Sequence, residues 1–124
     1  MTHFLSTADL LSDELRELIS TAMAFKAARR VSNELSGRSV ALVFLNPSLR
    51  TRASMQIAVF ELGGNPVLIE PGSTSWSIEY IDNAVMDGDR TEHIAEFVRV
   101  LSRYVSAIGV RTFATLTDWS LERT

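Results

Sequence analysis

Residues 39–54 read SVALVFLNPSLRTRAS, an apolar run followed by a break and then a polar run. The run from Ser39 to Phe44 is too short for a helix and is rich in valine, which predicts a buried β-strand. Asn46-Pro47-Ser48 interrupts it, because these residue types favour turns over regular structure. The stretch therefore predicts a strand that leads through a short loop into the next element.

Helical periodicity follows this loop and also precedes the strand. Apolar residues recur at helical spacing up to Gly63-Gly64, the glycine stop expected at a helix end, which predicts a second helix marked by Met55, Ala58, Val59 and Leu62. A first amphipathic helix is predicted from Ser12 to about Ala28, with Ser12 as its cap, on the apolar positions Leu15, Leu18, Ile19, Ala22 and Phe25.

The alternation continues downstream. Pro66 to Ile69 predicts a second strand, and Glu70 to Asn83 predicts a long loop of functional type. Asp89 and Glu92 resemble a capping box, which predicts a third helix whose inner face carries Ile94, Phe97, Val98 and Leu101. Ala107 to Val110 predicts a third strand, and residues 112–124 predict the beginning of a further helix. Strands alternating with helices indicate the α/β class, with a parallel sheet flanked by helices.

Composition excludes several classes of function. The 124 residues are 46% hydrophobic and 22% charged, which is typical of one globular domain. A net charge of -3 argues against binding to nucleic acid. There is no cysteine, no run approaching the roughly 20 apolar residues of a membrane span, and no secretory leader. We therefore expect a cytoplasmic protein that binds neither nucleic acid nor membrane.

In a parallel α/β sheet the ligand site lies beyond the carboxyl ends of the strands. Ser48-Leu49-Arg50-Thr51 falls there, at the start of the second helix, where free backbone N–H groups attract an anion. The hydroxyls of Ser48 and Thr51 and the guanidinium of Arg50 add donors. Arg111 would enter the same crevice if the third strand lies next to the first. The sequence predicts a phosphate site, and the alternative is an ordinary serine cap with solvated arginines.

Four other residues need an interpretation. Arg52 lies about 200° round the helix from Arg50, so a structural ion pair is expected for it. Trp76 in a polar loop indicates an interface or a ligand lid, or else an indole folded back on its own domain. His93 is expected inside the third helix, and neither it nor His3 has a partner for catalysis. No metal-ligand spacing and no cofactor motif is present.

These motifs resemble a known family. Ser48 to Arg52, followed by Glu61-Leu62-Gly63-Gly64, is similar to the S-x-R-T-R signature and downstream E-L-G-G of aspartate and ornithine carbamoyltransferases. Arg99 to Tyr104 and Gly109-Val110-Arg111 resemble the family's R-V-L-x-R-Y helix and following strand. Trp76 and the M-D-G-D stretch at residues 86–89 are similar to the N-acetylornithine carbamoyltransferase branch, with the N-succinylornithine branch close to it.

The resemblance implies a carbamoyl-phosphate site formed by Ser48, Leu49, Arg50, Thr51, Trp76 and Arg111, with Arg50, Thr51 and Arg111 as its catalytic residues. It implies transfer of the carbamoyl group to the side-chain amine of N-acetylornithine in arginine biosynthesis, without a cofactor or a metal. It also implies a homotrimer in which Trp76 enters a neighbouring site. N-succinylornithine and ornithine are the alternative acceptors.

The resemblance also implies a second domain, because the family's H-P-x-Q and H-C-L-P motifs have no counterpart in these 124 residues. Residues 1–124 are accordingly expected to be the carbamoyl-phosphate-binding domain of a truncated transcarbamylase, inactive by itself. The rival hypothesis is a phosphate-binding or regulatory module without turnover. A phospho-acceptor receiver domain is disfavoured, because the predicted strands end in Leu45-Asn46-Pro47 and Arg111 and not in an acidic pocket.

Overall fold

A computed structural model describes residues 3–28, 31–72, 76–81, 83–86 and 88–113 of the chain. The chain divides into two compact units, Met1–Val31 and Ser32–Thr124, and each is described by itself. The first unit contains a short 3-10 turn, η1, at Thr7–Asp9 and the helix α1 at Ser12–Ala27. No residue of α1 is buried.

The start of α1 differs from the prediction. The helix was expected to be capped by Ser12, but Leu11 occupies the cap position and Ser12 is the first helical residue. Glu14 takes over the capping interaction, because its Oε2 accepts a hydrogen bond of 2.8 Å from the Leu11 N–H. A carboxylate in the first turn also faces the positive end of the helix dipole. The predicted helix is confirmed, and its predicted cap is wrong.

The second unit is built on a three-stranded parallel sheet in the order β2-β1-β5. The strands are β1 at Ser39–Phe44, β2 at Asn65–Ile69 and β5 at Ala107–Arg111. Val43 pairs with Ile69 on one side of β1, and Phe44 pairs with Arg111 on the other. All three predicted strands are confirmed, and the carboxyl ends of β1 and β5 meet at the same edge of the sheet.

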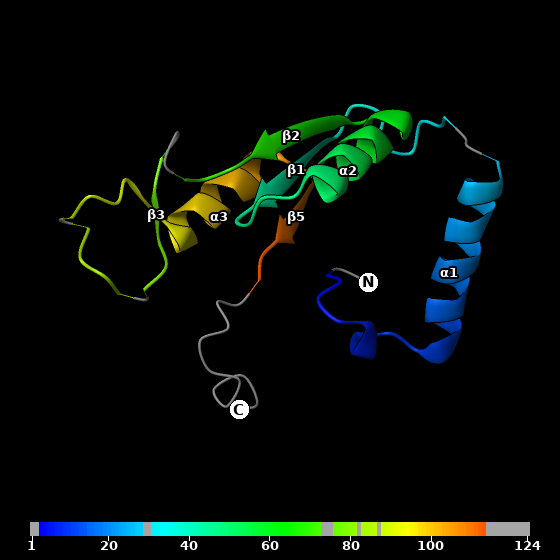
Figure 1. Ribbon diagram of the computed structural model, residues 1–124, viewed down its shortest axis with the longest axis horizontal. Coiled ribbons are helices and arrows are strands. Elements are labelled where there is room, and N and C mark those ends of the chain that lie inside the picture. The colour runs from blue at the N-terminus through cyan, green and yellow to red at the C-terminus, as the bar shows by residue number, and fades with distance from the viewer. Residues whose placement is uncertain (1–2, 29–30, 73–75, 82, 87, 114–124) are drawn as a thin grey trace. The chain divides into compact units, whose positions relative to one another are not determined.

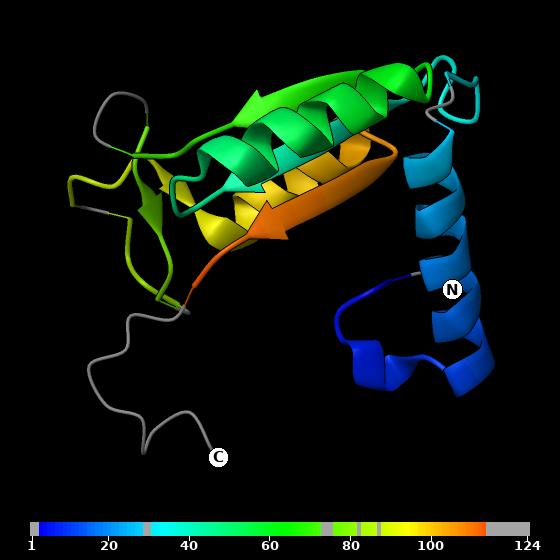
Figure 2. The same cartoon turned by 45° about the vertical axis from the view of Figure 1, so that its right-hand side comes forward.

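Helices cover both faces of this sheet. Figure 2 shows α2, at Leu49–Glu61, and α3, at Ile94–Tyr104, on opposite sides of the strands. Side chains alternate along β1, so Ala41 and Val43 join the core on the α3 face together with Ile69, Ile78, Phe97 and Leu101. Burying a side chain such as Phe97 or Leu101 contributes about 1.5–3 kcal/mol. The arrangement confirms the predicted α/β class.

The end of α2 confirms the glycine stop. The Gly64 N–H donates to the Val59 carbonyl and the Gly63 N–H to the Phe60 carbonyl, both at 2.9 Å, which is the Schellman pattern. Gly63 has a φ of 80°, a region that favours glycine. A Cβ on Gly64 would lie 2.9 Å from the Leu35 Cβ, so this position needs glycine for space as well.

The connection between β2 and α3 departs from the prediction (Figure 1). The region expected to be loop contains β3 at Ile78–Glu79, which pairs in parallel with β4 at Glu92–His93. Each strand has only two residues, too few to produce an alternating pattern in the sequence. The predicted capping box of Asp89 and Glu92 is wrong, because Glu92 belongs to β4.

His93 caps α3, and the prediction that it lies inside the helix is wrong. Its Nδ1 accepts a hydrogen bond of 3.1 Å from the Ala95 N–H, and the helix proper begins at Ile94. Phe97 and Leu101 are buried as predicted, whereas Val98, also expected on the inner face, is 43% exposed.

The helix predicted over residues 112–124 lies, from residue 114 on, outside the described residues. Among the helices that the structure describes, none is long and apolar enough to cross a membrane.

Candidate functional site

The site begins where β1 passes into α2. Ser48 is the N-cap of α2, with extended backbone angles, and its Oγ accepts a hydrogen bond of 3.3 Å from the Thr51 N–H. The first N–H groups of a helix have no partner within the helix, and they lie at the positive end of its dipole. The opening turn of α2 therefore presents donors to an anion at the carboxyl edge of the sheet.

Arg111 reaches this turn from the neighbouring strand. Its Nη1 donates a hydrogen bond of 2.9 Å to the Thr51 Oγ1, and the Ser48 Oγ donates to the same oxygen at 3.1 Å. A hydroxyl oxygen has two lone pairs, so these two donors occupy both and leave the Thr51 hydroxyl hydrogen to be donated. The predicted meeting of Ser48, Thr51 and Arg111 is confirmed, because β5 lies next to β1.

The Arg111 side chain holds a further donor. Its Nε is buried and has no hydrogen-bond partner among the residues that the structure describes. A buried N–H without a partner costs about 1–3 kcal/mol, so an oxygen of a ligand bound beside it would be favoured. The guanidinium also lies 4.5 Å from the centre of the Phe113 ring, a cation–π contact.

Phe113 and Asn46 were not identified from the sequence. The Phe113 N–H donates a hydrogen bond of 2.7 Å to the Asn46 Oδ1, which ties the end of β5 to the loop after β1. The available signal was spacing, because Phe113 follows Arg111 by two residues and successive side chains of an extended chain alternate in direction. Asn46 was interpreted only as part of a break.

Arg50 and Leu49 lie on the first turn of α2 and face outward. Leu49 is 83% exposed, and Arg50 is exposed with no hydrogen bond or ion pair to any described residue. The guanidinium of Arg50 is consequently not engaged elsewhere in the described part of the chain. Its position at the positive end of the dipole adds charge to the donors of Ser48, Thr51 and Arg111.

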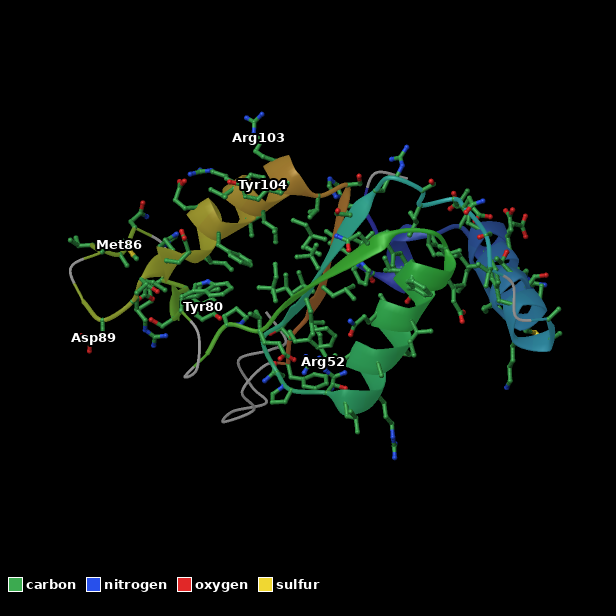
Figure 3. All side chains as sticks on the ribbon, turned by 90° about the horizontal axis from the view of Figure 1, so that it is seen from above. Arg52, Tyr80, Met86, Asp89, Arg103 and Tyr104 are labelled. Atoms are coloured by element: carbon green, nitrogen blue, oxygen red, sulfur yellow. The ribbon has the colours of Figure 1, made fainter. Side chains whose placement is uncertain are left out.

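Arg52 makes the structural ion pair predicted for it. Its Nη1 lies 3.2 Å from the Glu70 Oε2, and the two side chains are 45% and 42% exposed. Figure 3 shows the place of Arg52 on α2. A pair this exposed contributes about 0–1 kcal/mol. It borders a hollow of about 430 Å³ that extends from Ser48 and Leu49 to Pro71.

Trp76 is not bonded to Ser48, Thr51 or Arg111 of its own chain. Its side chain is 39% exposed, and its carbonyl accepts a hydrogen bond of 3.2 Å from the Gly72 N–H. No hydrogen bond or ion pair connects it to Ser48, Thr51 or Arg111. Among the described residues no group of His, Asp and Glu is arranged to hold a metal ion.

Hydroxyls, a helix amino terminus and a part-buried arginine at the carboxyl edge of a parallel α/β sheet are an arrangement typical of domains that bind oxyanions. Comparison with known proteins gives the family. Residues 2–123 match the model of the aspartate/ornithine carbamoyltransferase, carbamoyl-P binding domain. The chain belongs to this family.

Curated relatives with three acceptor specificities match the chain. The N-acetylornithine carbamoyltransferase of Xanthomonas campestris pv. campestris is 50% identical over 99% of the chain and 36% of its own length. The ornithine carbamoyltransferase of Parafrankia sp. is 45% identical over 90% of the chain and 33% of its length. The N-succinylornithine carbamoyltransferase of Bacteroides thetaiotaomicron is 34% identical over 85% of the chain and 33% of its own length.

A solved structure shows the same fold. The crystal structure of acetylornithine transcarbamylase complexed with acetylcitrulline matches with a TM-score of 0.87 and 50% identity, over 99% of this chain and 36% of that one. A mutant of N-acetyl-L-ornithine transcarbamylase complexed with carbamyl phosphate and N-succinyl-L-norvaline matches equally well, over 37% of its chain. The present chain thus spans about a third of the length of the relatives it matches.

Proposed function

We propose that this chain binds carbamoyl phosphate and contributes that site to a carbamoyltransferase. The proposed acceptor is the side-chain amine of N-acetylornithine, in a cytoplasmic step of arginine biosynthesis. The observation that carries the proposal is the Thr51 hydroxyl, which receives hydrogen bonds from Ser48 and Arg111 beside the unpartnered Nε of Arg111. A ligand with several closely spaced oxygens fits this set of donors.

The donors divide between the two ends of carbamoyl phosphate. The helix terminus, Ser48 and Arg50 hold the phosphate, with Leu49 contributing its backbone N–H. Thr51 and Arg111 donate to the carbamoyl oxygen. The uncharged amine of the acceptor attacks the carbamoyl carbon, the bond from that carbon to the phosphate oxygen breaks, and the departing phosphate takes up the proton that the amine loses. Loss of one donor to the developing oxyanion typically costs about 2.7–4 kcal/mol.

N-acetylornithine is favoured as the acceptor by the 50% identity to enzymes of that name. Ornithine and N-succinylornithine are the alternative acceptors, because an ornithine carbamoyltransferase and an N-succinylornithine carbamoyltransferase match at 45% and 34% identity. A phosphate-binding module without turnover is the second candidate function. It is favoured by the set of donors itself, since Ser48, Thr51 and Arg111 are all assigned to carbamoyl phosphate and none of them to the acceptor amine.

We further propose a homotrimer in which Trp76 contributes to the site of a neighbouring copy. The support is that Trp76 is 39% exposed and has no hydrogen bond to Ser48, Thr51 or Arg111 of its own chain. An exposed indole is typical of an interface.

The test is a calorimetric titration of the purified chain with carbamoyl phosphate. Arg50→Ala should weaken binding roughly 10- to 100-fold, because it removes a charge-assisted contact. Arg52→Ala, the matched control two residues away, should change the affinity less than about twofold, because its partner is Glu70. Equal losses in two folded variants would show that the site has been misplaced.

A further inference from the structure

Side chains of residues 90–93, just before α3, hydrogen-bond to backbone carbonyls of residues 77–81, the segment that follows Trp76. The Arg90 Nη1 donates to the Ile78 carbonyl at 3.0 Å, and the Thr91 Oγ1 donates to the Ser77 carbonyl at 3.2 Å. The His93 Nε2 lies 3.0 Å from the Ile81 carbonyl. Three side chains of one short stretch thus bind three carbonyls of another, and we call residues 90–93 the clasp.

The clasp adds to a pairing that is weak by itself. β3 and β4 share only two residue pairs, and so short a ladder is at best marginally stable. One buried side chain anchors it, because Ile78 is 2% exposed and packs in the core with Phe97 and Leu101. Residues on either side of Ile78 depend on other contacts, and for residues 77–81 the clasp supplies them.

His93 connects the clasp to the start of α3. Its Nδ1 accepts from the Ala95 N–H, so that nitrogen carries no proton, and in the neutral ring the proton lies on Nε2. The Nε2–H therefore donates to the Ile81 carbonyl. One imidazole satisfies a free donor of the helix and at the same time holds the segment beyond β3.

Trp76 lies two residues before the anchor. Its carbonyl is held by the Gly72 N–H at 3.2 Å, and the next residue, Ser77, is held by Thr91 and by the Glu92 N–H at 3.2 Å. The Ser77 Oγ also donates to the Asp89 carbonyl at 3.1 Å. Figure 3 shows Tyr80 and Asp89 on this connection, apart from Arg52 on the opening turn of α2.

We propose that Arg90 and His93 are positioning residues for Trp76. They set the place of the indole by holding the backbone carbonyls of Ile78 and Ile81, which fix the strand that follows Trp76. The inference rests on the proposed contribution of Trp76 to a neighbouring site. His93 thereby has a structural role, because its ring forms hydrogen bonds to two backbone groups.

The test uses the fluorescence of Trp76 in a Trp119→Phe background, which leaves one tryptophan in the chain. Acrylamide quenching reports the surroundings of the indole, and the thermal midpoint reports the stability of the unit. Arg90→Ala should change the quenching constant of Trp76 at least twofold with little change in the midpoint. His93→Ala should change both quantities.

His93→Asn separates the two contacts of His93. Asparagine accepts hydrogen bonds well at an N-cap, so it should restore the thermal midpoint. Its shorter side chain does not extend to the Ile81 carbonyl, so the quenching constant should stay altered. Arg99→Ala is the matched control, because Arg99 lies on α3 and pairs with Glu96 outside the clasp. It should leave Trp76 unchanged.

Parent-like quenching in both Arg90→Ala and His93→Asn would overturn the proposal. These measurements need no ligand, so their outcome is independent of carbamoyl phosphate binding. Altered quenching in a chain that does not bind carbamoyl phosphate would support the clasp and contradict the proposed function. Normal binding of carbamoyl phosphate together with parent-like quenching in the variants would support the proposed function and contradict the clasp.

Discussion

Thr51 shows how one hydroxyl can be turned into a directed donor. Because Ser48 and Arg111 both donate to its oxygen, the Thr51 hydroxyl hydrogen is left to be donated to an acceptor bound at the site. The three residues come from the loop after β1, the first turn of α2 and the end of β5. A substitution at any one of them changes the geometry of the other two.

Site residues that belong to a compact motif could be predicted from the sequence, and isolated ones could not. Ser48, Arg50 and Thr51 occur together at a helix start, and Arg111 follows from the expectation that the third strand lies next to the first. Phe113 has no motif, since its role depends on the Arg111 guanidinium lying over its ring.

Glu79 is the titratable residue whose environment allows a prediction about pH. Its Oε1 accepts hydrogen bonds from the Ile81 N–H and the Tyr80 N–H at 2.9 and 2.8 Å. The bond from Ile81 is the largest cause that lowers the pKa of Glu79, and the bond from Tyr80 and the charge of Arg90 act in the same direction. Burial opposes them.

The lowered pKa of Glu79 means that its ionised form is favoured in the folded chain. The stability it contributes is complete above the ordinary pKa of 4.5 and is lost as the pH falls through the lower folded value. We expect Trp76 quenching to change over this acidic interval, and Glu79→Gln to remove that change. Glu96→Gln, on the exposed side of α3, is the control, and an identical pH profile for Glu79→Gln and the parent would contradict the prediction.

At the scale of elements, α3 owes its place to two side chains. Phe97 and Leu101 are buried against Ala41 and Val43 of β1, whereas Val98 is 43% exposed. Phe97→Ala should lower the free energy of unfolding by about 3–5 kcal/mol, because it removes transfer energy and leaves a cavity. Val98→Ala should change it by only about 0.5 kcal/mol.

Denaturant unfolding of the two α3 variants measures this difference. A loss for Val98→Ala that equals the loss for Phe97→Ala would mean that the buried face of α3 has been assigned wrongly. The sequence predicted Ile94, Phe97, Val98 and Leu101 on one face, and helical spacing alone could not separate the exposed Val98 from the others.

The elements that could be predicted are those with a pattern long enough to measure. β1 has six apolar or small residues in a row, and α2 has both a serine cap and a glycine stop. β3 and β4 have two residues each, and their pairing depends on Arg90, Thr91 and His93 binding carbonyls across the connection. Such contacts join residues about a dozen positions apart and produce no periodicity.

At the scale of the whole molecule, the chain covers 36% of the length of its N-acetylornithine carbamoyltransferase relatives. Orienting two substrates can supply about 7–11 kcal/mol of a reaction barrier, and the donors of the proposed site would hold only carbamoyl phosphate. We expect the 124 residues expressed alone to bind carbamoyl phosphate but to carbamoylate N-acetylornithine negligibly. A product assay on the purified chain checks this, together with its mass in solution. Turnover by a monomer would contradict both this expectation and the shared role of Trp76.

The central claim is that carbamoyl phosphate binds at the opening turn of α2 against Arg111. The most direct measurement is a nuclear magnetic resonance titration of the nitrogen-labelled chain with carbamoyl phosphate, following the backbone amides and the arginine Nε–H groups. We expect the largest shifts at the amides of Leu49, Arg50 and Thr51, together with the Arg111 Nε–H, which has no hydrogen-bond partner in the described part of the chain. Shifts that leave the Arg111 Nε–H unchanged and concentrate on another part of the chain would contradict it.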